Sequence, residues 1–219
     1  MLTFYTTSKE VGGDLYDFYM DGNHLYFLIG DVSGKGVPAS LFMAITRSLF
    51  RTLSQHVLSP AKIVTEMNNS ISDNNESNMF VTLIVGILDL ETGILKLCNA
   101  GHNPPILIYP DGQVSYLEFK TQIFVGVVED FKYSDEEVVL EKESKLFLYT
   151  DGVTEAENIN KELYGEEKLL GMLSDNASSD VRTTVNVVVD SIASHVKEAE
   201  ASDDLTILLI QYEPGTANS

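Results

Sequence analysis

Hydrophobic and polar positions divide the chain into short apolar runs separated by polar turns and by stretches of helical periodicity. Residues 25–29 form a continuous apolar run, which is typical of a buried strand. The run ends at Gly30 and Asp31, and Gly34 and Gly36 then allow a sharp turn. A strand that delivers a carboxylate into a glycine-bounded turn can hold a hard metal ion, because the sheet fixes the carboxylate and the turn can present a backbone carbonyl.

Four helices are predicted from apolar residues that recur at helical spacing. In the first, residues 38–57, one apolar face is expected to pack on a sheet, and it consists of Leu41, Ile45, Leu49 and Leu53. Ser59 and Pro60 are typical of an N-cap and a first helical position, so a second helix begins there. A third helical region starts within residues 164–170, and a fourth is capped by Ser179 or Asp180 and runs to about residue 200.

Strands are predicted over most of the remaining chain. Turn sequences at residues 21–23 and 110–112 lie between apolar segments and indicate antiparallel hairpins. The predicted strands are residues 2–7, 15–20, 25–29, 79–89, 94–99, 106–109, 114–119, 138–140, 145–150 and 205–212. This order of elements predicts an α+β layered fold with antiparallel sheets.

The composition describes an acidic globular protein. At 219 residues, with 44% hydrophobic residues, the chain can form one domain with a sizeable core. We assign residues 1–213 to this domain and residues 214–219 to a disordered tail. The formal charge of −19 disfavours binding to nucleic acid or to an anionic membrane surface, so neither is an expected partner.

The single cysteine, Cys98, rules out an internal disulfide. Together with the absence of a signal-peptide pattern or an apolar run of membrane-spanning length, this favours a cytoplasmic protein. Strand-like residues follow Met1 almost directly, which suggests a domain of a longer protein.

Aspartates recur at the ends of predicted strands beside glycine or other small residues. The set consists of Asp14 after two glycines, Asp31, Asp151 before Gly152, and the pair Asp203 and Asp204. Roughly four such carboxylates can hold two Mg²⁺ or Mn²⁺ ions, and two ions can activate a water and neutralise a phosphoryl group. Any one aspartate alone is more often a cap or turn residue. The joint pattern is what predicts a metal site.

Six segments, in order, resemble the motifs of the SpoIIE-like (RsbU-like) branch of the PPM-type metal-dependent serine/threonine phosphatases. They are GGDLYD (12–17), GDVSGKGVPASL (30–41), MFVTLIVG (79–86), NAGHNPP (99–105), LYTDGVTEAEN (148–158) and DDLTILLI (203–210). The resemblance covers residues 9–211. It implies a four-layer αββα sandwich of two antiparallel sheets flanked by helix pairs.

The resemblance also implies hydrolysis of phosphoserine or phosphothreonine on a protein, without a phosphoenzyme. Two Mn²⁺ or Mg²⁺ ions would activate the attacking water, and Asp31 and Asp151 would act catalytically through them. By position, the implied ligands are Asp14, directly or through water; Asp31, bridging both ions; Val32, through its backbone carbonyl; Asp151; and Asp203 with the adjacent Asp204.

The implied substrate is a phosphorylated anti-sigma-factor antagonist of the STAS type in a partner-switching pathway such as a stress response. A sensor or receiver domain is expected upstream. Two features of the wider PPM pattern are missing: a histidine after the bridging aspartate, where Ser33, Gly34 and Lys35 stand, and an arginine before Asp14, where Lys9 is the nearest basic residue. The substrate-binding group is therefore unknown, and Lys35 is either a phosphate ligand or a solvated loop lysine.

Other chemistries fit the sequence less well. GGDLY resembles the GGDEF motif of diguanylate cyclases, but the other five motifs would then be unexplained. A phosphate-binding loop would need glycine at position 29 and serine or threonine at position 36, where Ile29 and Gly36 stand. Cys98 lacks an arginine six residues on, and His102 is more simply a turn residue. The alternative function is a catalytically silent module that keeps the fold and binds a partner.

Overall fold

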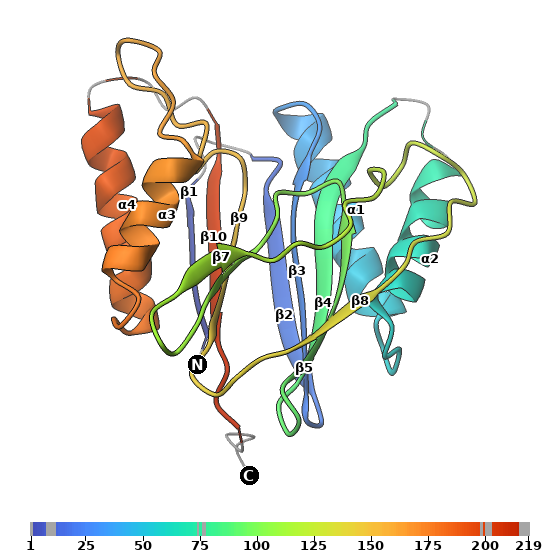
Figure 1. Cartoon of the computed structure of the whole chain (residues 1–219). Coiled ribbons are helices and arrows are strands. Elements are labelled where there is room, and N and C mark those ends of the chain that lie inside the picture. The colour runs from blue at the N-terminus through green and yellow to red at the C-terminus, as the bar shows by residue number, and fades with distance from the viewer. Residues whose placement is uncertain are drawn as a thin grey trace. The chain divides into compact units, whose positions relative to one another are not determined.

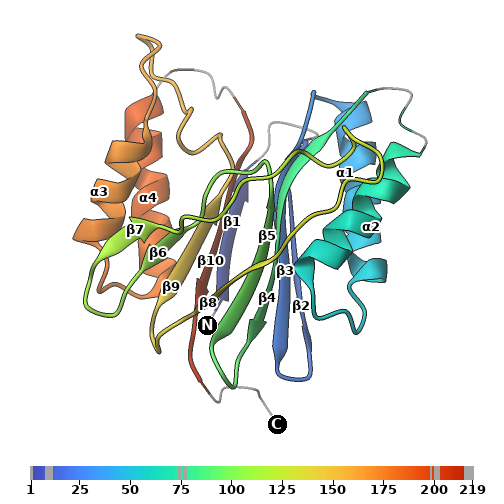
Figure 2. The ribbon, with the colours of Figure 1, turned by 45° about the vertical axis from the view of Figure 1, so that its right-hand side comes forward.

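The computed structural model describes residues 2–7, 12–73, 75, 78–197, 199 and 203–214, and within residues 2–7 only the backbone. In this part, ten strands and four helices form two five-stranded antiparallel sheets with their helices (Figures 1 and 2). Contacts divide the chain into two compact units, which we call the Asp31 unit (residues 12–102 and 118–140) and the Asp151 unit (residues 2–7, 103–117 and 141–213). Residues 215–219 of the predicted tail lie outside the described residues.

The Asp31 unit is a five-stranded sheet with two helices packed on it. Its strands, in spatial order, are β2 (Leu15–Asp21), β3 (His24–Val32), β4 (Val81–Asp89), β5 (Ile94–Ala100) and β8 (Glu136–Val139). Helices α1 (Val37–Leu53) and α2 (Pro60–Ser72) contact β2, β3, β4 and β5. The unit thus has two layers, with the strand that carries Asp31 buried inside the sheet.

Close packing between β3 and β4 depends on a glycine in mid-strand. Phe27 of β3 and Gly86 of β4 are register partners, and a Cβ atom added at Gly86 would overlap the Phe27 ring. Phe27 is fully buried. The Phe27 ring therefore fills the space that a side chain at position 86 would occupy. This packing fixes the register in which Asp31 lies opposite Thr82.

Helix α1 uses a different face from the one that its periodicity predicts. Leu41 and Ile45 are 62% and 55% exposed, so their predicted packing on the sheet is wrong. The buried positions are Ala39, Thr46 and Phe50. Apolar residues occupy most of the circumference of α1, so their spacing alone does not determine the buried face. The helix ends at Leu53 rather than near residue 57.

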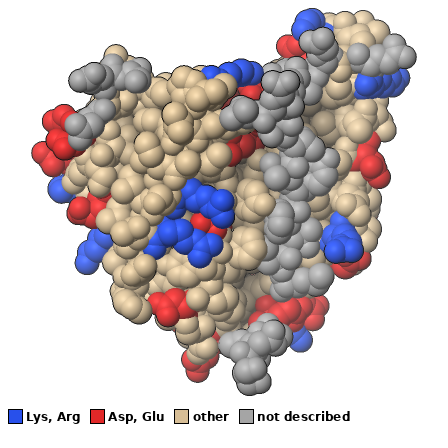
Figure 3. All heavy atoms as spheres, turned by 180° about the vertical axis from the view of Figure 1, so that it is seen from behind, with Lys and Arg blue, Asp and Glu red and all other residues tan. Residues whose placement is uncertain are grey.

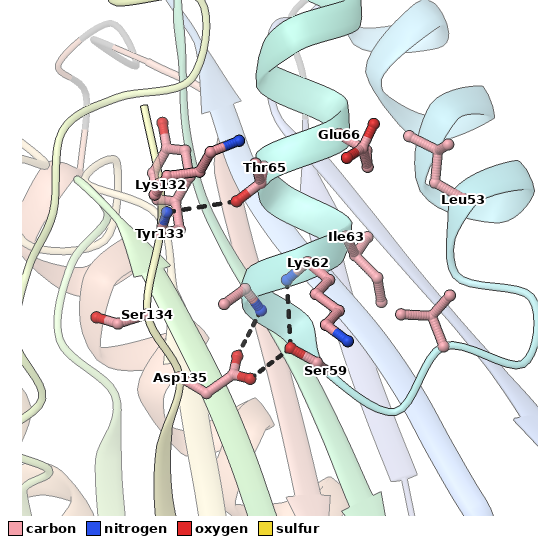
Figure 4. A pocket seen from close by; sticks show the side chains of 12 residues that line it. Leu53, Ser59, Lys62, Ile63, Thr65, Glu66, Lys132, Tyr133, Ser134 and Asp135 are labelled. Atoms are coloured by element: carbon pink, nitrogen blue, oxygen red, sulfur yellow. Dashed lines mark hydrogen bonds between the residues drawn. The ribbon is translucent and has the colours of Figure 1, made fainter. Parts of the chain in front are cut away.

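Helix α2 begins as predicted. Pro60 is its first residue, and the Ser59 hydroxyl accepts a hydrogen bond from the Lys62 backbone N–H at 3.3 Å. The Asp135 carboxylate adds a second cap, accepting hydrogen bonds from the Ala61 backbone N–H and, at 2.6 Å, from the Ser59 hydroxyl (Figure 4). The residues predicted to line the inner side of this helix are buried: Ile63, Met67 and Ile71.

The Asp151 unit has the same plan. Its strands, in spatial order, are β1 (Leu2–Thr7), β10 (Leu205–Gln211), β9 (Lys145–Tyr149), β6 (Ile106–Ile108) and β7 (Val114–Tyr116), and its helices are α3 (Glu166–Asp175) and α4 (Val181–Val196). Asp180 is the N-cap of α4, and its carboxylate accepts hydrogen bonds from the backbone N–H groups of Arg182 and Thr183, both at 3.0 Å. The helix ends at Val196, four residues earlier than predicted.

The two antiparallel sheets and four helices confirm the predicted α+β fold class. In the part of the chain that the structure describes, no helix is both long enough and apolar enough to cross a membrane.

Candidate functional site

Asp31 and Val32 are the last two residues of β3. At this point the strand packs against Gly13, which has no side chain. The Val32 N–H donates to the Gly13 carbonyl at 3.3 Å. A Cβ atom at Gly13 would lie 2.9 Å from the Val32 carbonyl oxygen and 3.2 Å from the Asp31 carboxylate. Because Leu15 pairs with Gly30, Asp14 lies across the strands from Asp31. The structure thus brings together Asp14, Asp31 and Val32.

The predicted glycine turn follows directly. Gly34 and Gly36 have φ angles of 89° and 76°, in the region that favours glycine. Ser33 holds the turn to the next strand, since its N–H donates to the Phe80 carbonyl at 2.8 Å and its hydroxyl accepts from the Phe80 N–H at 2.9 Å. Lys35 is exposed in this turn. The turn therefore fixes the backbone beyond Asp31 and presents Lys35 to solvent.

A hydrogen-bonded group of Thr82 on β4, Asn99 on β5 and His102 just after β5 supports the same strand end. The Thr82 hydroxyl lies 3.0 Å from the Nδ1 atom of His102 and donates to the Asp31 carbonyl at 3.4 Å. Asn99 holds His102, because its side chain accepts from the His102 N–H at 2.8 Å and donates to the His102 carbonyl at 3.0 Å. His102 is thus the locally hydrogen-bonded turn residue that the sequence indicates, and it is buried.

In the Asp151 unit, the ends of β9 and β10 come into backbone contact. The Thr150 N–H donates to the Thr206 carbonyl, and the Thr206 N–H donates to the Thr150 hydroxyl, both at 3.0 Å. A Cβ atom at Gly152 would overlap the carbonyl oxygen of Asp204. The structure therefore brings Asp151 and the Asp203–Asp204 pair to neighbouring strand ends.

Glu155 adds a further carboxylate that the spacing of the motifs does not single out. Its N–H donates to the Asp151 carbonyl at 2.7 Å. Burial raises the pKa of the Glu155 carboxyl, and the negative charges of Asp151 and Asp203 raise it further. Negative charge is therefore concentrated at this strand end. Glu155 is visible in the sequence segment TDGVTEAEN, but its position near Asp151 and Asp203 depends on how the loop folds.

The predicted ligands are divided between the two units. The Asp31 unit holds Asp14, Asp31 and Val32, and the Asp151 unit holds Asp151, Asp203 and Asp204. Among the residues that the structure describes, no group of three or more His, Cys, Asp or Glu side chains is arranged to hold a metal ion. Every predicted donor is a carboxylate or carbonyl oxygen, and this chemistry fits Mg²⁺ and Mn²⁺.

Asp17 belongs to the GGDLYD segment but has a different role. It is 4% exposed and accepts hydrogen bonds from Arg51 at 2.5 and 2.6 Å and from Arg47 at 3.2 Å. Burial raises the pKa of the Asp17 carboxyl, but the two guanidinium groups outweigh it and hold the pKa below its usual value. Asp17 therefore ties β2 to α1. Figure 3 shows basic side chains gathered around acidic atoms on the face seen from behind.

The structure argues against a cysteine nucleophile. Cys98 is fully buried, and burial raises the pKa of its thiol, whereas a nucleophilic cysteine needs a low pKa and access to substrate. Cys98 is thus a core residue, as the sequence indicates.

A pocket of about 660 Å³ lies in the Asp31 unit beside α2. Leu53, Val57 and Ile63 line its apolar side, and Asp135 and Ser59 lie at its polar end (Figure 4). Asp135 and Ser59 already cap α2, so these two polar groups have a structural role in the helix.

Residues 21–213 match the family model for Stage II sporulation protein E (SpoIIE). The chain belongs to the SpoIIE family, within the PPM-type serine/threonine phosphatases. This SpoIIE-family chain is 26% identical over 205 residues to phosphoserine phosphatase RsbU of Bacillus subtilis and 28% identical over 217 residues to phosphoserine phosphatase RsbP of the same organism. The matches cover 93% and 96% of this chain but only 60% and 52% of those relatives.

The SpoIIE-family chain also resembles a solved phosphatase domain. The SiaA-PP2C domain of Pseudomonas aeruginosa superposes with a TM-score of 0.87 at 21% identity, covering 97% of this chain and 86% of that one. The likeness shows that the chain has the PP2C fold, which agrees with the predicted fold class.

Proposed function

We propose that the chain is the catalytic domain of a metal-dependent protein serine/threonine phosphatase that removes phosphate from phosphoserine or phosphothreonine of a regulatory protein. The observation that carries the proposal is the close backbone approach at Gly13 and Gly152. At each glycine, the absence of a Cβ atom lets backbone pack against a predicted metal ligand. Membership in the SpoIIE family supports the same reaction.

The proposed ligands are Asp14, Asp31 and the Val32 carbonyl from the Asp31 unit, and Asp151, Asp203 and Asp204 from the Asp151 unit, binding two Mn²⁺ or Mg²⁺ ions. When bound, such ions supply Lewis acidity that activates a water and neutralises charge on a phosphoryl group. Asp31 would hold metal from a fixed position, because it lies near the end of β3, a buried strand with a neighbouring strand on each side.

The chain's own residues supply the positioning. Gly34 and Gly36 turn the backbone sharply after Asp31, and Gly13 leaves space beside the Asp31 carboxylate, where a Cβ atom would lie 3.2 Å from its oxygen. Lys35, exposed in the same turn, is the proposed phosphate-binding group. A lysine there would offset part of the negative charge that the carboxylates concentrate, and so would favour an incoming phosphate.

The proposed substrate is a phosphorylated STAS-type protein, and the pathway is partner switching. Support comes from the relatives RsbU and RsbP, which are phosphoserine phosphatases. By the same resemblance, we propose that a sensor or receiver domain lies upstream in a longer protein located in the cytoplasm, where it takes part in a response such as stress signalling.

The test is phosphate release from a phosphoserine peptide and from a phosphorylated STAS-domain protein, with Mn²⁺ or Mg²⁺. Asp31→Asn should abolish turnover and weaken Mn²⁺ binding in calorimetry while circular dichroism stays unchanged. The matched control is Asp130→Asn, an exposed aspartate with a φ of 54°, a conformation that asparagine tolerates well. Metal-independent turnover, or full activity of Asp31→Asn, would refute the proposal. Undetectable turnover of the phosphoprotein by wild type would favour a silent binding module.

A further inference from the structure

A rigid hairpin leaves the Asp151 strand end and exposes aliphatic side chains near its tip. Residues 154–165, which we call the 154–165 hairpin, run out from Asp151 and return to α3. Figure 1 draws this orange segment projecting beyond α4 of the same unit. Ile159 near the tip is 72% exposed, and Leu163 on the returning arm is 54% exposed.

Backbone hydrogen bonds between its two arms stiffen the hairpin. They run from Gly165 N–H to Thr154 O and from Tyr164 N–H to Ala156 O, both at 2.9 Å, and from Asn158 N–H to Glu162 O at 3.1 Å. At the tip, the Asn158 side chain accepts from the Asn160 N–H at 2.8 Å and donates to the Glu162 carboxylate at 2.7 Å. The tip is thus held in one shape before any partner arrives.

The base of the hairpin is anchored in the core of the Asp151 unit. Ala156 and Tyr164 are buried in that core, and the Tyr164 hydroxyl donates to the Ser191 hydroxyl on α4 at 2.9 Å. The Nε2 atom of His195, also on α4, lies 2.9 Å from the Glu162 carbonyl. Because the buried base holds the hairpin in place, folding does not require the exposed Ile159 side chain at the tip.

The hairpin begins next to Asp151, and this position indicates which partner its tip contacts. The Glu155 N–H bonds to the Asp151 carbonyl at 2.7 Å, so the hairpin begins at a proposed metal ligand. Ile159 is eight residues from Asp151, so their Cα atoms are at most about 29 Å apart. A standard protein interface of about 800 Å² per partner is roughly 30 Å across, so one interface is wide enough to include both Asp151 and the hairpin.

We propose that the 154–165 hairpin is a docking element for the folded phosphoprotein substrate, in which Ile159 enters an apolar recess next to the phosphorylated residue and Leu163 packs at its edge. This inference rests on the proposed phosphatase function. Preorganisation of the hairpin lowers the entropy cost of binding, so a single buried aliphatic side chain contributes substantially to affinity. A short phosphopeptide has no such recess and does not use the hairpin.

The experiment compares a phosphorylated STAS-domain protein from the same organism with a phosphopeptide of about ten residues cut from it, both in Mn²⁺. Wild type should prefer the folded protein in kcat/KM. Ile159→Ser should lower the protein-to-peptide ratio of kcat/KM about tenfold, mainly through KM for the protein, and Leu163→Ser about threefold. The matched control is Val139→Ser on β8, which replaces an aliphatic side chain 63% exposed in the other unit and should leave the ratio unchanged.

Three results would overturn the proposal: no preference of wild type for the folded protein, an unchanged ratio in Ile159→Ser, or an equal fall on both substrates. The last would mean that the hairpin supports the carboxylates instead. Light scattering adds a fourth, because a dimer that Ile159→Ser dissociates without changing the ratio would make the partner a second copy of the chain.

Affinity for the phosphoprotein, measured in EDTA by interferometry, separates this proposal from the proposed function. If wild type turns over neither substrate, the phosphatase function fails. The docking proposal is still tested in that case, since Ile159→Ser should bind the phosphoprotein about tenfold more weakly than wild type.

Discussion

Gly152 lies directly against the backbone of Asp204, so that a Cβ atom added at Gly152 would overlap the Asp204 carbonyl oxygen. The two residues are far apart in the sequence, yet each adjoins an aspartate of the proposed metal-binding set. The neighbouring strands β9 and β10 are in register, with Tyr149 opposite Ile207. Because backbone atoms cannot rotate out of the way as a side chain can, the contact requires glycine.

Gly152→Ala should therefore lower both stability and metal affinity. The added methyl group forces the two strand ends apart, and overpacking of this kind costs about 1–3 kcal/mol in the free energy of unfolding. Urea unfolding and Mn²⁺ calorimetry measure the two effects. The matched control is Gly171→Ala in α3, where an added Cβ atom has no other atom within 4 Å. This substitution should stabilise the helix by up to about 1 kcal/mol, because alanine has a higher helix propensity than glycine. Equal behaviour of the two variants would contradict the packing argument.

Asp17→Asn should destabilise the protein in a pH-dependent way. At neutral pH the loss of hydrogen bonds from Arg51 and Arg47 to a charged acceptor should cost about 1–3 kcal/mol. The pKa of the Asp17 carboxyl is lower in the folded protein than its ordinary value of 3.8. The stabilisation that the Asp17 carboxylate gives the folded protein is therefore complete above pH 3.8. It is lost as the pH falls through the lower pKa of the folded state.

Urea unfolding of wild type and Asp17→Asn at a series of pH values checks this prediction. The difference between them should be constant at neutral pH and should shrink as the pH falls below about 3.8. A difference that persists unchanged into acid would show that Asp17 acts through its shape rather than its charge. Asp130→Asn, at an exposed position, should match wild type throughout.

Much of the fold and the separate strand ends could be predicted from the sequence because those features depend on local chemistry. An apolar run that ends in glycine and aspartate indicates both a strand and its end, as for Asp31 and Asp151. Ser59 followed by Pro60 indicates a helix start for the same reason, since both residues favour that backbone geometry.

Features that depend on contacts between distant segments could not be predicted. Leu41 and Ile45 were expected to face the sheet but are exposed, because the sequence of an all-round apolar helix does not say which face meets β3. The charge on Glu155 matters only because its loop folds back toward Asp151 and Asp203. The second cap on α2 comes from Asp135, which is 76 residues from Ser59.

Gly101→Ala should be strongly destabilising, and Phe124→Ala should partly relieve it. Gly101 has a φ of 79°, where an alanine costs about 1–2 kcal/mol, and its Cβ atom would overlap the Phe124 ring. Phe124 also stacks on Phe80 with ring centroids 5.0 Å apart, so the ring cannot move without losing that contact. The double variant should keep the backbone strain but lose the clash.

A double-mutant cycle in urea tests this prediction. The coupling free energy between positions 101 and 124 should be favourable by about 0.5–3 kcal/mol, meaning that the double variant is more stable than the sum of the single changes predicts. Strict additivity would show that the Phe124 ring does not cover Gly101.

Removal of divalent metal should abolish turnover and lower thermal stability, since the proposed ions bind the folded chain only. With metal at about one hundred times its dissociation constant, the free energy of unfolding should rise by about 2.7 kcal/mol per site over its value in EDTA. Thermal unfolding across a Mn²⁺ or Mg²⁺ titration measures this rise. Asp31→Asn should lose most of the metal-dependent increase, whereas Asp130→Asn should retain it. A metal-dependent increase that survives unchanged in Asp31→Asn would show that Asp31 is not a ligand of the ions, because removing the charge of a ligand weakens metal binding and the stabilisation that depends on it.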